Sequence, residues 1–430
     1  MLAGCGDGNP PEVMGSGGWP GGASEWTVLA YMGGDNDLEE ALIGDFNEME
    51  IIGSTASVSV IAQMDRRIGY DTTNGNWVTC RRFRVERDPS EPGTPQDGQH
   101  NHIMVTTHLA DLGEVNMGDE DTFVDFVEWG MQNYPARRYF VVLVNHGWGW
   151  YPRSVSSRDV ASAASRGVMF DDAPAWDYLS NAELKSALER IKATRGKNLE
   201  ILGMDVCQEA LLEVAYQVRD SVDYMVASEL EEPNDGYPYD RILYRLNNSP
   251  SQSTETFLLG VLQDYLDSYE PGQYTVGAGA SVTNTAFRES EVAALANAVD
   301  NLAQALRAKL PGAANDLVSI RGATQSFSEI IYRDLYDFAE RVMAHFADPS
   351  LDALCQDVID RVGPGAGTAL VGEVHRSGTS SFPTTNVDNA HGVMVYLPTL
   401  PTQYLPDYGT AVDFAAQTQW DEYISDNSGL

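Results

Sequence analysis

The chain has 430 residues and a formal net charge of −36, because 63 Asp and Glu outnumber 27 Lys and Arg. This charge excludes a nucleic-acid-binding surface, which needs cations to neutralise phosphates, and favours peptide or protein partners that carry basic residues. Hydrophobic residues make up 43% of the chain, which is enough to bury a large core and excludes wholesale disorder. The chain contains no run of 18 apolar residues, the length that would indicate a membrane-spanning helix.

The N-terminal residues carry a signal for a cellular compartment. Leu2-Ala3-Gly4-Cys5 resembles a bacterial lipobox, at which a signal peptide is cut and the new N-terminal Cys is acylated. The basic and apolar segments that precede a lipobox are missing, and residues 7–23 are rich in Gly and Pro. We therefore expect an exported protein of the bacterial cell envelope, attached to the membrane only by a lipid at Cys5, with residues 1–25 as lipobox remnant and flexible tether. The alternative is a chance match of four residues.

Short apolar runs alternate with helical patterns through the first two thirds of the chain. The runs are typical of strands buried on both faces of a parallel sheet: Trp26–Met32, Ser57–Met64, Tyr139–Val144, Leu199–Met204 and Val222–Ala227. The helical patterns are Leu38–Ile52, Asp121–Asn133, Ser180–Ile191 and Gln208–Arg219. This alternation predicts an α/β fold of three layers, with a mostly parallel central sheet flanked by helices.

The pattern changes after residue 285. Glu289–Leu310 and Ser326–Phe346 have the spacing of long amphipathic helices, and two further strands are expected at Gly367–Val374 and Gly392–Leu397. We therefore predict a core domain at residues 26–285 and a C-terminal helical and β subdomain at residues 286–430 that packs on it.

Two strand ends carry residues suited to nucleophilic catalysis. His146 follows the run 139–144, and Cys207 follows the run 199–204 directly before a predicted helix. The carboxyl ends of neighbouring parallel strands share one edge of a sheet, so the two side chains are expected to meet there. A helix N-terminus and a nearby His lower the pKa of a thiol, and the backbone N–H groups of Gly147 and Cys207 would suit an oxyanion. The alternatives are a buried apolar Cys and a loop His.

Several motifs together resemble one protein family. Val141–Gly147 followed by Met204–Cys207 is similar to the motifs of the clostripain family of cysteine endopeptidases, which has a caspase-like fold shared with gingipains, legumains and caspases. Further similar blocks are Val28–Glu39, Glu232–Tyr239 and His391–Pro398. The resemblance covers about residues 26–424, with weak stretches at 85–120 and 310–370, and implies that residues 26–285 form a caspase-like catalytic domain.

The resemblance implies a catalytic dyad with a basic substrate preference. Cys207 would be the nucleophile, His146 the acid and base, and the bond after Arg or Lys the one cleaved. By similarity, Asp205 lines the pocket for that basic residue, and we assign Asp235 as a second carboxylate there. Asp205 as a structural carboxylate and the acidic residues 229–235 as a solvated loop are the alternatives.

The resemblance implies that no cofactor is required, although some members of the family depend on calcium. Asp35, Asp37 and Glu39 alternate as oxygen ligands might be spaced, but the EF-hand pattern is absent and helix capping explains them equally well. We therefore predict no metal ligand and keep Ca²⁺ as an alternative.

Family members are often zymogens that cut themselves between the His and Cys strands. Residues 151–169 read as an exposed loop with Arg153, Arg158 and Arg166, and we expect self-cleavage after Arg158 or Arg166. A plain surface loop is the alternative. A second function also stays open, namely a surface lipoprotein on the same scaffold that binds or adheres without cleaving. Cys80 and Cys355 either pair or are buried thiols.

Overall fold

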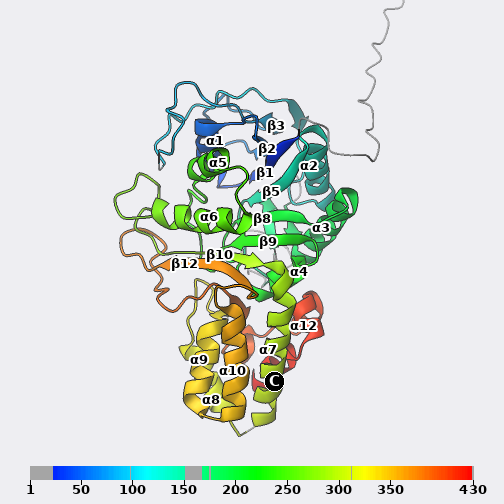
Figure 1. The fold of residues 1–430 in the computed structure, drawn as a ribbon, viewed down its shortest axis with the longest axis vertical. Coiled ribbons are helices and arrows are strands. Elements are labelled where there is room, and N and C mark those ends of the chain that lie inside the picture. The colour runs from blue at the N-terminus through cyan, green and yellow to red at the C-terminus, as the bar shows by residue number, and fades with distance from the viewer. Residues whose placement is uncertain (1–22, 97, 151–166, 174–175, 311, 429–430) are drawn as a thin grey trace, which may run out of the picture.

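The computed structural model describes residues 23–96, 98–150, 167–173, 176–310 and 312–428 (Figure 1). Within this part of the chain, nine strands form one sheet in the order β12-β10-β9-β8-β5-β1-β2-β3-β4. The five strands from β9 to β2 are parallel, whereas the two strands at each end pair antiparallel. The strands are β1 (Ser24–Gly34), β2 (Val58–Arg66), β3 (Cys80–Arg84), β4 (Ala110–Gly113), β5 (Ala136–Val144), β8 (Leu199–Asp205), β9 (Val222–Ala227), β10 (Val282–Arg288) and β12 (Leu370–Arg376).

The apolar runs form strands because successive side chains pack on opposite faces, and both faces are covered. In β1, Leu29 and Tyr31 enter one core while Val28 and Ala30 enter the other. Helices α2 (Glu120–Asn133), α3 (Asn181–Arg195) and α4 (Leu212–Val218) lie over the first face, and α1 (Glu39–Ile52), α5 (Tyr239–Asn248) and α6 (Thr254–Ser268) over the second (Figure 1). The predicted three-layer α/β fold is confirmed.

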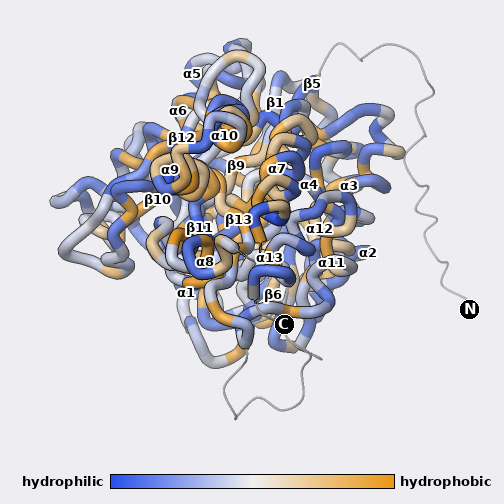
Figure 2. Tube along the Cα trace, turned by 90° about the horizontal axis from the view of Figure 1, so that it is seen from below, coloured by the Kyte–Doolittle hydropathy of each residue, from blue (hydrophilic) through white to orange (hydrophobic). Residues whose placement is uncertain are grey.

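A group of helices extends beyond the β12 end of the sheet (Figure 1). It contains α7 (Glu289–Lys309), α8 (Ala314–Ala323), α9 (Leu335–Phe346) and α10 (Pro349–Val362). The small strands β11 (Tyr332–Asp334) and β13 (Met394–Tyr396) and the short helices α11 (Tyr408–Ala411), α12 (Asp413–Gln417) and α13 (Trp420–Ser428) lie beside it. Figure 2 shows these elements from below, with hydrophobic segments gathered between them. Strand β12 returns from this region to pair with β10 in the central sheet.

Two predicted helices differ from the structure. The helix expected at 208–219 begins only at Leu212, because Gln208 adopts a positive φ of 61° and Ala210 instead donates its N–H to Ser228. The helix expected at 326–346 begins only at Leu335, with Asp334 as its N-cap, because the preceding residues form β11. The helical spacing continued across both boundaries, so local sequence did not reveal them.

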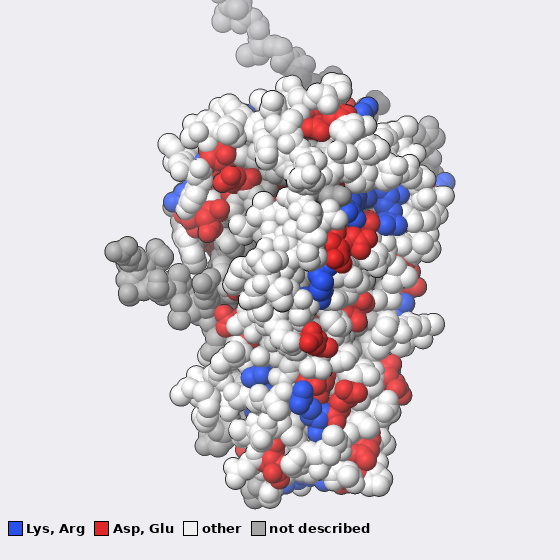
Figure 3. All heavy atoms as spheres, turned by 90° about the vertical axis from the view of Figure 1, so that its left-hand side faces the viewer, with Lys and Arg blue, Asp and Glu red and all other residues white. Residues whose placement is uncertain are grey.

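The structure also resolves the state of two cysteines. Cys80 and Cys355 are both buried free thiols and do not pair with each other. None of the helices in the described ranges is long and apolar enough to span a bilayer. Acidic side chains form several separate groups on the face shown in Figure 3, with basic groups between them. The net charge is therefore distributed over this face and not concentrated in one patch.

Candidate active site

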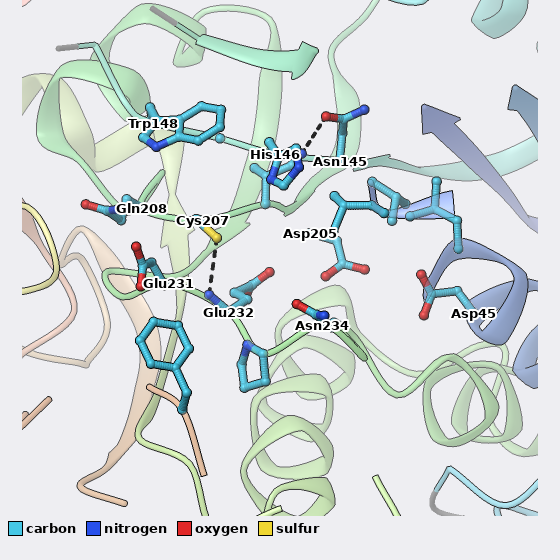
Figure 4. A pocket seen from close by; sticks show the side chains of 18 residues that line it. Asp45, Asn145, His146, Trp148, Asp205, Cys207, Gln208, Glu231, Glu232 and Asn234 are labelled. Carbon is cyan, nitrogen blue, oxygen red and sulfur yellow. Dashed lines mark hydrogen bonds between the residues drawn. The ribbon is translucent and has the colours of Figure 1, made fainter. Parts of the chain in front are cut away.

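The two predicted catalytic residues lie at the same cavity. Strands β5 and β8 pair in parallel, with Val144 opposite Asp205, so both chains leave the sheet at the same edge. Two residues further along each chain, His146 and Cys207 line a cavity of about 230 Å³ (Figure 4). The expected convergence of thiol and imidazole, 61 residues apart in sequence, is therefore present in the fold.

Asn145 fixes the backbone that presents His146. Its side-chain amide donates to the carbonyl oxygens of Gly33 at 2.6 Å and Phe170 at 3.0 Å, and its Oδ1 accepts from the N–H of Phe170 at 3.0 Å. A Cβ on Gly33 would stand 2.5 Å from the Asn145 amide nitrogen, so only glycine permits this approach. The amide thereby links the end of β5 to β1 and to β6 (Gly167–Asp171), which pairs with β7 (Asp177–Ser180).

The imidazole of His146 is held by two neighbours. Its Nε2 lies 2.8 Å from Oδ1 of Asp37, and its ring stacks on Trp148 with centroids 5.3 Å apart. A carboxylate at this position orients the ring and stabilises the imidazolium that forms when the ring takes a proton. Within the described residues Nδ1 of His146 takes part in no hydrogen bond. The contact between Asp37 and His146 could not be predicted from the sequence, because it depends on the pairing of β1 with β5.

Cys207 occupies a loop between β8 and α4. The helix begins five residues later, so the expected lowering of the thiol pKa by a helix N-terminus at Cys207 is wrong. The sulfur accepts a hydrogen bond from the N–H of Glu232 at 3.4 Å. Burial, and after it the negative charge of Glu232, raise the pKa of the Cys207 thiol well above its usual range. The Cys207 thiol is therefore expected to be protonated at neutral pH.

Gly147 permits the close approach of the two strand ends. A Cβ at this residue would lie 2.7 Å from the carbonyl oxygen of Cys207 and 2.9 Å from Oε1 of Glu209. The same Glu209 oxygen accepts the N–H of Gly149 at 2.8 Å, which ties the two loops together. Gly147 and Cys207, the predicted oxyanion donors, both line the cavity.

Four carboxylates also line the cavity, from Asp45, Asp205, Glu231 and Glu232 (Figure 4). Asp205 is 4% exposed and accepts from the hydroxyl of Tyr239 at 2.6 Å and the N–H of Tyr237 at 3.1 Å. Burial raises the pKa of Asp205 to about 6. Asp45 from α1 is equally buried, and both Glu232 carboxylate oxygens are buried without a hydrogen bond within the described residues. The sequence analysis missed Asp45, because a single acidic residue within an amphipathic helix gives no local sign that it faces a cavity.

Asp235 lies outside this lining, although its neighbours Asn234 and Gly236 belong to it. Its Oδ2 accepts the N–H of Val276, and its carboxylate lines an adjoining cavity of about 300 Å³. Burial raises the pKa of Asp235 to about 6. Asp205 thus lines the Cys207 cavity, whereas Asp235 lines the adjoining cavity.

The side chains of the three residues considered as calcium ligands contact three different sets of neighbours. Glu39 is fully buried and forms an ion pair with Arg66 at 2.6 Å, while Asp37 contacts His146. Asp35 alone joins a carboxylate cluster, in which its ligand atom and those of Glu114 and Asp171 lie within 4.8 Å of one another. Residues 35, 37 and 39 therefore do not surround one ion.

Cys5, Arg153, Arg158 and Arg166 lie outside the described residues. The chain enters β6 at Gly167, and Trp148 donates its N–H to the Gly167 carbonyl at 3.3 Å.

Comparison with known proteins agrees with this arrangement. The sequence profile of the clostripain family matches residues 30–426, so the chain belongs to the clostripain family. Clostripain from Hathewaya histolytica is 26% identical over 244 residues, which are 53% of this chain and 43% of that protein. The chain thus matches less than half the length of this curated relative. The family predicted from the motifs at His146 and Cys207 is confirmed.

Two solved structures share the fold. A secreted C11 cysteine protease from Bacteroides thetaiotaomicron, in complex with an irreversible peptide inhibitor, is 18% identical with a TM-score of 0.60 and covers 95% of this chain and 100% of its own. An inactive zymogen C11 protease from Parabacteroides distasonis is 16% identical with a TM-score of 0.63, covering 92% and 98%. The predicted caspase-like architecture is therefore confirmed.

The raised pKa of Cys207 predicts slow alkylation that accelerates with pH. In the uncleaved chain we expect the rate of Cys207 modification by iodoacetamide to rise about tenfold per pH unit from pH 7 to 9, because only the thiolate reacts. Glu232→Gln should lower the pKa of the Cys207 thiol and so raise the rate, because it removes the carboxyl group whose charge opposes the thiolate. Peptide mapping by mass spectrometry measures the rate, with buried Cys80 and Cys355 as internal controls. A plateau below pH 8 would contradict the prediction.

Proposed function

We propose that this protein is a cysteine endopeptidase that cleaves peptide bonds on the carboxyl side of Arg or Lys. The observation that carries the proposal is one cavity lined by a thiol and an imidazole on one side and by buried carboxylates on the other. Family membership supports the same activity, as does the peptide inhibitor bound to the Bacteroides thetaiotaomicron protease.

The reaction needs only groups of this chain and water. Cys207 gives its proton to His146 as its sulfur attacks the substrate carbonyl carbon, and the N–H groups of Gly147 and Cys207 donate to the oxyanion. The C–N bond then breaks, and His146 returns the proton to the leaving amine. Water attacks the thioester and loses a proton to His146, and the acid product leaves as the proton returns to sulfur. Asp37 acts as a positioning residue that stabilises the imidazolium.

The acidic side of the cavity explains the choice of a basic residue. Asp205, Asp45 and Glu232 bring three carboxylates together with no Lys or Arg among the residues that line the cavity. Like charges in a buried space disfavour one another, so a guanidinium or ammonium that enters the cavity gains their combined attraction. An aspartate side chain would meet only repulsion there. We therefore assign Asp205 as the main binding residue for the basic side chain, supported by Asp45 and Glu232.

The proposal includes the location of the protein. We infer export to the bacterial cell envelope with a lipid anchor at Cys5, on the basis of the Leu2-Ala3-Gly4-Cys5 pattern. The related protease from Bacteroides thetaiotaomicron is described as secreted, which supports export. Residues 26–285, which supply every catalytic group named above, would then be joined to the lipid anchor at Cys5 through residues 6–25.

Clostripain-family peptidases need no cofactor in general, and any calcium requirement of this chain would be met at Asp35, Glu114 and Asp171. Asp65 is a further carboxylate near this cluster: its Oδ2 is buried without a hydrogen bond within the described residues, and burial, followed by the charges of Asp171 and Glu114, raises its pKa to about 9. Carboxylate oxygens are the ligands that Ca²⁺ prefers. The ion would supply positive charge beside the turn that holds Asp37, and no step of the reaction passes through it.

Substitutions in the cavity should separate catalysis from binding. Cys207→Ala and His146→Ala should each lower turnover of Arg and Lys fluorogenic peptides by at least about a thousandfold. The first variant loses the nucleophile, and the second loses the group that transfers the proton. Asp205→Asn should instead raise KM by about thirtyfold, since a buried partner of the cation disappears. KM should also rise as pH falls below about 6, where Asp205 takes a proton and loses its charge.

Steady-state kinetics with and without a thiol alkylator measure these effects. Glu340→Gln, an exposed substitution on α9, is the matched control and should leave kcat and KM unchanged. Equal turnover of peptides with Arg and with Asp before the cleaved bond would contradict the assigned specificity. No turnover of any peptide would instead favour the binding or adhesion lipoprotein.

We further propose that the chain activates itself by cleavage after Arg158 or Arg166. N-terminal sequencing of purified wild-type protein should then find new termini at Asp159 or Gly167. These termini should be absent from Cys207→Ala, because the cleavage requires the same thiol. An identical fragment pattern in both proteins would show that another protease makes the cut.

Calcium binding at the Asp35 cluster can be tested without measuring activity. Ca²⁺ in excess of its dissociation constant should raise the thermal unfolding midpoint by about 2–4 °C, because a ligand that binds only the folded state stabilises it. Glu114→Gln with Asp171→Asn should abolish this shift, and the surface substitution Asp121→Asn should retain it. A shift of equal size in the double variant would place the ion elsewhere.

A further inference from the structure

A second cavity adjoins the candidate active site, and no step of the proposed reaction uses it. Its volume is about 300 Å³, and it shares Asp45 and Asn234 with the Cys207 cavity as a common wall. One face of α1 and the turn before it form one side, with Asp37, Glu40, Gly44, Asp45 and Glu48. His100 and His102 from the loop between β3 and β4 form another side, with Asp235 from the loop after β9.

The lining of this second cavity is strongly acidic. Five carboxylates line it, and no Lys or Arg is among its described lining residues: Asp37, Glu40, Asp45, Glu48 and Asp235. The two histidine rings lie 4.2 Å apart, and burial followed by the charge of His102 lowers the pKa of His100 to about 4. His100 is therefore neutral near pH 7 and does not offset the acidic groups. The cavity is electrostatically suited to a cation.

Two buried polar groups in this wall lack a partner. Asp45 is 4% exposed and receives no hydrogen bond from any described residue, although it lines both cavities. Nδ1 of His100 is also buried without a hydrogen bond within the described chain. Burial and the charges of Asp205, Glu48 and Asp235 raise the pKa of Asp45 well above its usual range, so an incoming cation would relieve the repulsion among these carboxylates. The unsatisfied groups point to a ligand that brings positive charge and donors.

We infer that this cavity is a second subsite for the same substrate and accepts another cationic side chain. The protein would then prefer peptides in which two basic residues lie near the cleaved bond. One basic side chain enters the Cys207 cavity, and the other enters between Glu40 and Asp235. The inference rests on the proposed function for the position of the first residue. It also gives Asp235 a role that fits its place outside the first cavity.

Binding to a catalytically inactive chain tests the subsite directly. Calorimetry with Cys207→Ala would compare a peptide that contains one Arg with a series of peptides that contain two. In this series the second Arg occupies, one position at a time, each of the four positions before and the four positions after the first Arg. We expect one position at which the second Arg tightens binding by about five- to tenfold, the gain of a partly buried ion pair. Glu at that position should weaken binding relative to Ala.

A double variant tests whether the named residues cause the preference. In the Cys207→Ala background, Glu40→Gln with Asp235→Asn should reduce the ratio of the two affinities toward one. Glu340→Gln with Asp360→Asn, two exposed substitutions that remove the same charge elsewhere, should keep the ratio. This control separates a local contact from the long-range effect of the −36 net charge.

The outcomes distinguish this inference from the proposed function. Equal affinity for one-Arg and two-Arg peptides at every position, or a ratio unchanged by the double variant, would overturn the subsite. If the wild-type protein cleaves single-Arg peptides in that case, the endopeptidase assignment stands. Tighter binding of two-Arg peptides by a wild-type protein that cleaves nothing would retain the subsite and reject the endopeptidase.

Discussion

The parallel pairing of β5 with β8 is the constraint on which the candidate site depends. Val144 lies opposite Asp205, so the next residues of both strands emerge together at the carboxyl edge of the sheet. A shift by one residue would turn apolar side chains of β5 from one core into the other, and both cores are fully packed. The burial of the two strands therefore also fixes the relative positions of His146 and Cys207.

Electrostatics connects recognition with reactivity in this cleft. Asp205, Asp45 and Glu232 are gathered without an internal cation, and the same Glu232 helps to raise the pKa of the Cys207 thiol. A cation bound among these carboxylates would weaken that effect and lower the pKa of the thiol. The adjoining cavity repeats the pattern with Glu40 and Asp235. The common physical feature of the two cavities is a lining of several carboxylates with no Lys or Arg among the described lining residues.

The sequence predicted the five parallel strands of the central sheet well, because continuous apolar runs are a strong local signal, but it missed β3, β4 and β10 toward the two ends of that sheet. It predicted helix boundaries less well, since the helical spacing before Leu335 and around Gln208 continued into segments that tertiary contacts keep out of helix. Of the site residues, His146, Cys207 and Asp205 came from motifs next to strands. Asp37 and Asp45 did not, because the partners that define their roles come from elements more than 100 residues away.

The local sequence patterns and motifs were therefore enough to identify the α/β class, the clostripain family and the pair of residues expected to react. Which carboxylates face the thiol, which one holds the imidazole and where Asp235 lies depended on the folded arrangement of α1, β1, β5, β8 and the loop after β9. The physical reason is that charge and burial act through space. A carboxylate acquires its function from the neighbours that desolvate or pair it, and those neighbours are distant in sequence.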